Sequence, residues 1–150
     1  MFPRKSRSSA SSSCCDSPLP WTLAAPSFVW PARVGENCRR LEPLVDEVAV
    51  MLFEIQSCLA YTEEDLPRDM AALDLSYHLH LPLDLPWDDP AEAAALAAKL
   101  VEQTSFVHPR AFVLHPPTSP EVLDRFFQAW EQLGLKVSTL FLENIQGNDL

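Results

Sequence analysis

Three side chains of the types that bind metals lie near the ends of short apolar runs: His80, His115 and Glu143. The chain has 4 histidines in 150 residues, so two of them at such positions is an unusual concentration. Two neutral imidazoles and one carboxylate are a common ligand set for catalytic zinc, with a fourth position left for water. We therefore expect these residues to hold a divalent metal, with zinc as the first candidate and manganese or cobalt as alternatives.

Other polar or aromatic residues near the same runs are candidates for contacts to a substrate. Glu54 follows the run 47–53, and either binds substrate or metal or forms a salt bridge. Asp84 and Trp87 lie in the segment after the run 76–81, where Trp87 either stacks on a planar ligand or covers the core.

Two further residues are expected to support the metal ligands. His78 lies two residues before His80, on the same face of an extended strand, and we expect it to pack beneath His80 or orient it. Asn144 follows Glu143 directly and is assigned the same supporting part. His108, in the loop before the run 111–115, is expected at the opposite end of the sheet, in a structural role.

The elements that position these residues form a repeating unit of an apolar run, a polar turn and a segment with helical periodicity. The runs span residues 23–29, 47–53, 76–81, 111–115 and 138–143. Each is short and mostly continuous, which is typical of buried parallel strands. Five such βα units imply right-handed crossovers, and they bring the carboxyl ends of the strands to one edge.

The intervening helices carry recognisable start and stop signals. Asp89 before Pro90 and Ser119 before Pro120 each pair a capping residue with proline at the first helical position. Gly134 fits a left-handed position just after the helix that starts at Pro120. We also expect a helix starting at Thr62, followed by three acidic residues, and a short helix over 35–44 that must end at Pro43.

Two architectures fit this pattern, a doubly wound sheet and part of a (β/α)8 barrel. A complete barrel needs about 250 residues. We expect residues 21–150 to be the N-terminal part of such a barrel, containing about five βα units. Residues 1–20 are basic and rich in Ser and Pro, and are expected to be a disordered tail.

Composition excludes several classes of function. The net charge of −10 opposes sequence-independent binding to nucleic acid. No apolar run approaches the roughly 20 residues that a membrane-spanning helix requires. The 4 cysteines show no disulfide-framework spacing, which favours a reducing cytoplasm.

Three motifs resemble the xylose isomerase-like barrel superfamily, which includes endonuclease IV: residues 80–82 (HLP), 113–116 (VLHP) and 142–144 (LEN). In the endonuclease IV branch the matching two histidines and glutamate bind zinc, with the glutamate bridging to a second ion. The resemblance implies that role for Glu143, which would then be both ligand and catalytic residue.

A longer set of motifs is similar to the cobamide remodeling phosphodiesterases: residues 25–29 (APSFV), 35–39 (GENCR), 53–54 (FE) and especially 77–87 (YHLHLPLDLPW). This resemblance implies hydrolysis of the nucleotide-loop phosphoester of a corrinoid substrate. The alternatives are a sugar-phosphate isomerase or epimerase on the same barrel, and an inactive truncated chain. A DNA-repair nuclease fits less well, because no Lys/Arg-rich loop follows any run.

Overall fold

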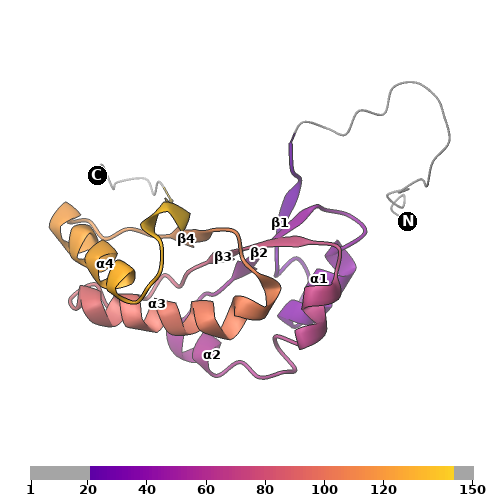
Figure 1. Cartoon of the computed structure of the whole chain (residues 1–150). Helices are drawn as coiled ribbons and strands as arrows, with labels where there is room; N and C mark the ends of the chain where they lie inside the picture. Colours follow the sequence, from indigo (N-terminus) through magenta and orange to yellow (C-terminus); the bar gives the residue numbers. More distant parts are fainter. Residues whose placement is uncertain (1–20, 144–150) are drawn as a thin grey trace.

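The structure, a computed structural model, describes residues 21–143, in which five strands alternate with helices (Figure 1). The strands are β1 (Ala24–Pro26), β2 (Glu47–Met51), β3 (Ser76–His80), β4 (Phe112–Leu114) and β5 (Leu140–Leu142). The α-helices are α1 (Val34–Leu41), α2 (Ile55–Leu59), α3 (Pro90–Thr104) and α4 (Pro120–Gln132). Short 3₁₀ helices span Arg68–Ala72, Ser105–Val107 and Val137–Thr139. Each predicted apolar run contains one strand, which is shorter than the run.

The strands form one parallel sheet in the order β1-β2-β3-β4-β5. The predicted α/β class is therefore confirmed. This sequential order is that of a stretch of (β/α)8 wall, whereas a doubly wound sheet reverses its strand order part-way along. Within residues 21–143 the sheet is open, because no strand pairing joins β5 to β1.

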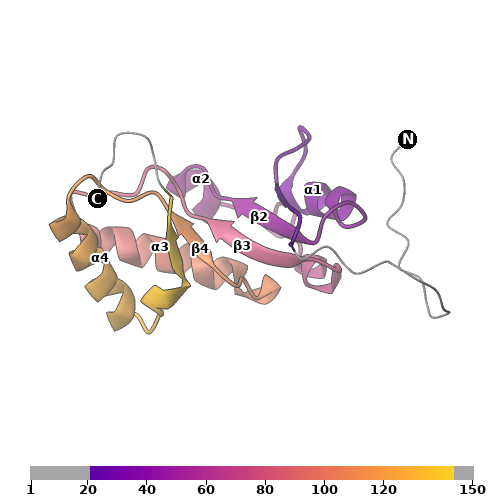
Figure 2. The same cartoon turned by 90° about the horizontal axis from the view of Figure 1, so that it is seen from above.

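The core lies between the sheet and the helices beneath it. Figure 1 shows α2 and α3 below the strands, and Figure 2, seen from above, shows β3 and β4 lying over α3. Strands β2 and β3 bury alternate residues, and the buried positions Val48, Val50, Tyr77 and Leu79 are at most 2% exposed. The sequence predicted continuously buried runs. The structure instead leaves the opposite face of these two strands partly exposed, and that face carries His78 and His80.

The two long helices begin as predicted. The Asp89 carboxylate accepts hydrogen bonds from the backbone N–H groups of Ala91 and Glu92, and Ser119 Oγ accepts one from Val122. Gly134 has φ = 81° just after α4, where a Cβ would be strained. The apolar stripe of α4 buries Leu123, Phe126 and Trp130.

The predicted second helix is wrong. Thr62 starts a turn instead, in which the Asp65 carboxylate accepts hydrogen bonds from the Thr62 backbone N–H and hydroxyl. Pro67 then adopts an extended conformation and precedes a 3₁₀ helix. The α-helix of this unit is α2, which follows β2 almost directly. The Asp84 carboxylate accepts a hydrogen bond from the Ile55 N–H in the first turn of α2. The two residues are 29 positions apart, so local sequence signals cannot reveal this cap.

The first helix is close to expectation. α1 spans Val34–Leu41 and ends before Pro43. Gly35 is needed there because a Cβ at this residue would lie 2.5 Å from Pro67 Cγ. Residues 1–20, the predicted tail, lie outside the described part. No helix within residues 21–143 has both the length and the apolar character needed to cross a bilayer.

Candidate metal centre

The three predicted ligands meet at the carboxyl ends of adjacent strands. His80 is the last residue of β3, and His115 and Glu143 follow β4 and β5 directly. The backbone N–H of Glu143 donates to the carbonyl of Leu114, so the ladder between β4 and β5 continues up to the glutamate. Because neighbouring parallel strands are in register, their ends bring residues 63 apart in the sequence into contact.

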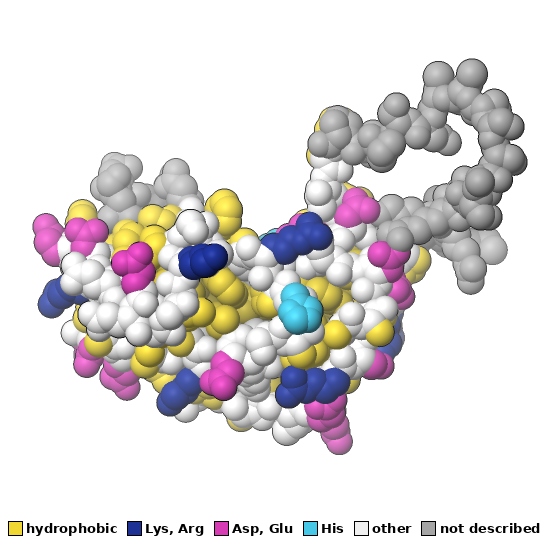
Figure 3. Space-filling view, in the orientation of Figure 1, with side chains coloured by type: hydrophobic (Ala, Val, Ile, Leu, Met, Phe, Trp, Pro, Cys, Tyr) yellow, Lys and Arg dark blue, Asp and Glu magenta, His cyan; other side chains and the backbone are white. Residues whose placement is uncertain are grey.

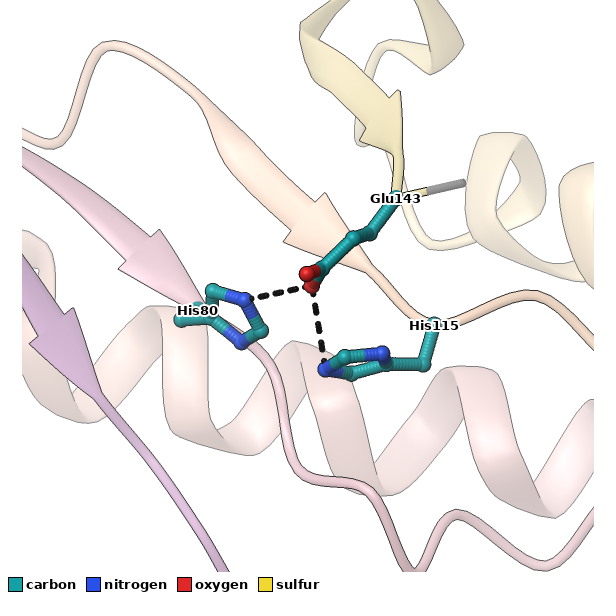
Figure 4. A group of neighbouring side chains, drawn as sticks. All are labelled: His80, His115 and Glu143. Atoms are coloured by element: carbon teal, nitrogen blue, oxygen red, sulfur yellow. Dashed lines mark hydrogen bonds and ion pairs between the residues drawn. The ribbon is translucent and has the colours of Figure 1, made fainter. Parts of the chain in front are cut away.

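The Glu143 carboxylate lies between the two imidazoles (Figure 4). Its Oε2 is 2.8 Å from His80 Nε2 and 3.3 Å from His115 Nε2. The imidazole ring centroids are 4.7 Å apart. The histidine side chains are 16% and 14% exposed and that of Glu143 is 44% exposed, so the group opens toward solvent through the carboxylate.

These three side chains could hold one divalent ion. One nitrogen from each histidine and one Glu143 oxygen all lie within 4.8 Å of one another. Tetrahedral zinc with bonds of about 2.0–2.1 Å separates its ligand atoms by about 3.3 Å. The His115–Glu143 pair has that separation already, and the His80–Glu143 pair needs to open by about half an ångström from its hydrogen-bonded distance.

Burial favours the metal-binding protonation state of His115. Desolvation is the largest influence and lowers the pKa of His115; the Glu143 carboxylate raises it and His80 lowers it, with a net decrease. His115 is therefore neutral at neutral pH, and a neutral imidazole is the form that binds metals. Its Nδ1 is buried with no hydrogen-bond partner among the described residues.

His78 does not contact the candidate metal group, which consists of His80, His115 and Glu143. Its Nδ1 lies 2.5 Å from Oε1 of Glu47, and the two side chains are each 20% exposed. Ser76 Oγ lies 3.4 Å from the other oxygen of the same carboxylate and donates to the Asp46 carbonyl at 3.1 Å. The structure thus gives His78 a partner on β2 rather than a direct contact with His80, and the sequence analysis did not single out Glu47.

The predicted substrate-binding residues have mainly structural contacts. The Asp84 carboxylate accepts a hydrogen bond from the backbone N–H of Ile55 at 2.9 Å, and so caps the first turn of α2. The half-buried Trp87 packs edge-on against Phe126, with ring centroids 5.3 Å apart, which favours the core-covering alternative. Glu54 is exposed and accepts a hydrogen bond from Ser57 Oγ.

Two other positions from the sequence analysis lie away from the metal group or beyond the described chain. Asn144 lies outside the described residues. His108 is exposed in the loop before β4, with the left-handed φ of 49°, at the end of the sheet opposite the metal group.

Sequence reasoning missed the apolar wall of the site. A hollow of about 230 Å³ is lined by the three predicted ligands together with Met51, Phe53 and Leu83. Met51 pairs in register with His80, so the alternation of β2 alone could have placed Met51 and Phe53 on the face of the metal group.

Comparison with known proteins adds no relative. No family model, curated protein sequence or solved structure matches this chain.

Proposed function

We propose that this protein is a metal-dependent hydrolase of phosphodiesters. The observation that carries the proposal is the convergence of His80, His115 and Glu143 at one edge of a parallel sheet. In α/β folds with parallel strands, this edge is where ligands bind. Zinc is the proposed metal, and manganese or cobalt can occupy the same ligand set.

The three residues have distinct parts in this proposal. When bound, a divalent ion polarises a phosphoryl oxygen and lowers the pKa of bound water toward neutrality. His80 and His115 hold the ion through Nε2, the nitrogen that each already directs at Glu143. Both imidazoles contact the same oxygen of Glu143, Oε2. Its Oε1 can therefore face a second ion or the attacking water, which is the catalytic part we assign to Glu143.

The proposed substrate is the nucleotide-loop phosphoester of a cobamide. This step rests on the similarity of residues 77–87 to the cobamide remodeling phosphodiesterases, a segment that contains His80. Within it, Tyr77 is buried and its hydroxyl donates to the Met70 carbonyl, while Asp84 and Trp87 have the structural contacts described above. Direct contacts to substrate therefore fall to His80 and to side chains elsewhere along the rim, which include the exposed Glu54.

The surface charge supports a small-molecule substrate over nucleic acid. Figure 3 shows Lys and Arg side chains as separate spots among acidic ones on the face in view. Several arginines are paired with carboxylates, for example Arg39 with Asp69 at 2.8 Å and Arg33 with Glu64. Cys38 and Cys58 are free, buried thiols, in keeping with the cytoplasmic location that we also propose.

The test is turnover of a cobamide by the purified protein with zinc, manganese or cobalt. Chromatography should show release of the lower-ligand nucleoside, and His80→Ala and Glu143→Gln should each abolish it. His108→Ala, which alters an exposed histidine at the other end of the sheet, is the matched control and should remain active. Isomerisation of a sugar phosphate, with no nucleoside released under any metal, would favour the isomerase alternative instead.

A further inference from the structure

The edge of the sheet continues past the metal group onto two aromatic side chains. Phe53 follows β2 and Phe28 follows β1, at the same ends of the strands as the metal ligands. They are 44% and 50% exposed, and their rings pack edge to face with centroids 5.1 Å apart. The rim is thus aromatic at the ends of β1 and β2 and carries the predicted ligands at the ends of β3, β4 and β5.

The aromatic pair adjoins the metal group directly. Phe53 and Met51 line the hollow that contains the three ligands. The same two residues also line a second hollow of about 180 Å³, which extends to Phe28 and Arg33. A ligand held at the metal group can therefore extend across Phe53 toward Phe28 without leaving the surface.

Backbone and side-chain hydrogen bonds hold this aromatic surface in place. Ser27, next to Phe28, donates its N–H to the Ala49 carbonyl, and its hydroxyl accepts from the Met51 N–H at 3.0 Å. The carbonyl of Phe53 accepts the Leu83 N–H. The backbone around both phenylalanines is therefore fixed while their rings stay exposed, an arrangement that lowers the entropy cost of binding.

A fully buried asparagine fixes the loop that follows Phe28. Asn37 Oδ1 accepts from the Trp30 N–H, and its Nδ2 donates to the carbonyls of Trp30, Ala32 and Arg33. Asn37 is 0% exposed, so these bonds are shielded from water. An exposed aromatic residue beside such a buried polar network is better explained by ligand binding than by a loose loop.

We propose that Phe28 and Phe53 bind a flat, apolar ring of a ligand whose phosphate lies at His80, His115 and Glu143. This inference rests on the proposed function for the phosphate end and defines its substrate class: phosphoesters that carry a planar ring, in preference to open-chain sugar phosphates. The rings of Phe28 and Phe53 offer faces for stacking and no donor or acceptor for sugar hydroxyls.

The test compares three probes by calorimetry with the zinc-loaded full chain: 1-naphthyl phosphate, glycerol 3-phosphate and 1-naphthol. Naphthyl phosphate should bind roughly tenfold more tightly than glycerol 3-phosphate, the scale of one ring stacked on an aromatic side chain. Phe53→Ala and Phe28→Ala should each remove most of that preference and leave zinc affinity and glycerol 3-phosphate affinity unchanged.

Two variants control for surface hydrophobicity and folding. Phe53→Tyr keeps a ring and should keep the preference. Leu133→Ala truncates another half-exposed apolar residue, 50% exposed after α4, and should change nothing. Because both phenylalanines are half-exposed, the alanine variants should fold, which a circular dichroism melt checks.

The outcomes separate this inference from the proposed function. If zinc does not bind but naphthol binds and Phe53→Ala abolishes that binding, the ring site stands and the metal function fails. Equal affinity for the two phosphates, or a preference that survives both alanine variants, overturns the ring site. A third result also overturns it: light scattering shows that the alanine variants convert a dimer into a monomer, and calorimetry shows no preference for the ring. The aromatic pair would then be an interface between two copies.

Discussion

The substitution Asn37→Asp tests the hydrogen-bond network that fixes the loop between β1 and α1. It preserves the size of a fully buried side chain and replaces the Nδ2 donor with an oxygen. That oxygen would face the carbonyls of Trp30, Ala32 and Arg33, which accept from Nδ2 at 3.2, 3.0 and 3.2 Å. The bond from the Trp30 N–H to Oδ1, 2.9 Å long, can persist.

The expected cost in unfolding free energy at pH 7 is about 3–5 kcal/mol. Nδ2 has two hydrogens shared among the three carbonyls, and losing them costs about 2 kcal/mol together. A buried carboxylate without a cationic partner accounts for the rest. A domain of this size is stable by about 5–15 kcal/mol, so the variant should unfold at a clearly lower urea concentration.

The cost should also depend on pH, with a defined sign. Burial among carbonyls raises the pKa of the introduced carboxyl group above the value of about 3.9 that an aspartate has in the unfolded chain. A raised folded-state pKa means that folding favours the protonated form. The penalty is therefore smallest below about pH 4 and grows as pH rises through the folded-state pKa.

Urea titrations at pH 5.0, 6.5 and 8.0, followed by far-ultraviolet circular dichroism, measure both effects. Gln128→Glu makes the same amide-to-acid change on the exposed side of α4 and is the matched control, with a change below about 0.5 kcal/mol expected at every pH. A penalty for Asn37→Asp below about 1 kcal/mol, or one that stays constant across this pH range, would refute the assignment of Asn37 as the fixed point of the loop.

Three further predictions follow from the site and the core. His115→Ala should weaken zinc binding by at least about tenfold in competition with a chromophoric chelator, since one of three protein ligands is lost, while His108→Ala leaves it unchanged. Trp87→Ala should lower the free energy of unfolding measured in urea by about 2–4 kcal/mol, because the Trp87 ring packs on Phe126, and should leave zinc affinity intact. A stable variant with impaired ligand binding would instead support a contact between Trp87 and substrate. Burial raises the pKa of Cys38 to about 12, so iodoacetamide at pH 8 should label it only after unfolding, as peptide mass spectrometry can show.

The convergence of three metal-binding residue types could be predicted because it depends on a regular pattern. His80, His115 and Glu143 each end an apolar run, and parallel strands place such ends at one edge whatever the details of the helices. The caps at Asp89 and Ser119 were equally accessible, because each bond joins residues two or three positions apart. These signals are local or periodic, so one sequence is enough to read them.

What the sequence could not supply are contacts between residues far apart along the chain. The sequence analysis predicted a substrate contact for Asp84, which stays a prediction, and did not foresee that its carboxylate also caps α2 from 29 residues away. The sequence left Trp87 open between a ligand and the core, and its ring contact with Phe126 of α4 favours packing. The segment after Thr62 has the acidic residues of a helix start, yet the Asp65 side chain closes a turn there and Pro67 stays extended.

The order of the strands explains why one rim can have two chemical halves. The strands lie in the sheet in the same order as in the chain. Residues that end consecutive strands are therefore neighbours along the rim. From β1 to β5 the rim carries Phe28, Phe53, His80, His115 and Glu143. A shuffled strand order would have interleaved the aromatic residues with the ligands and left neither a continuous apolar surface nor a group of three within reach of one ion. The sequential topology therefore connects the metal proposal to the ring proposal: the same register that gathers the ligands at β3–β5 sets the phenylalanines beside them at β1–β2.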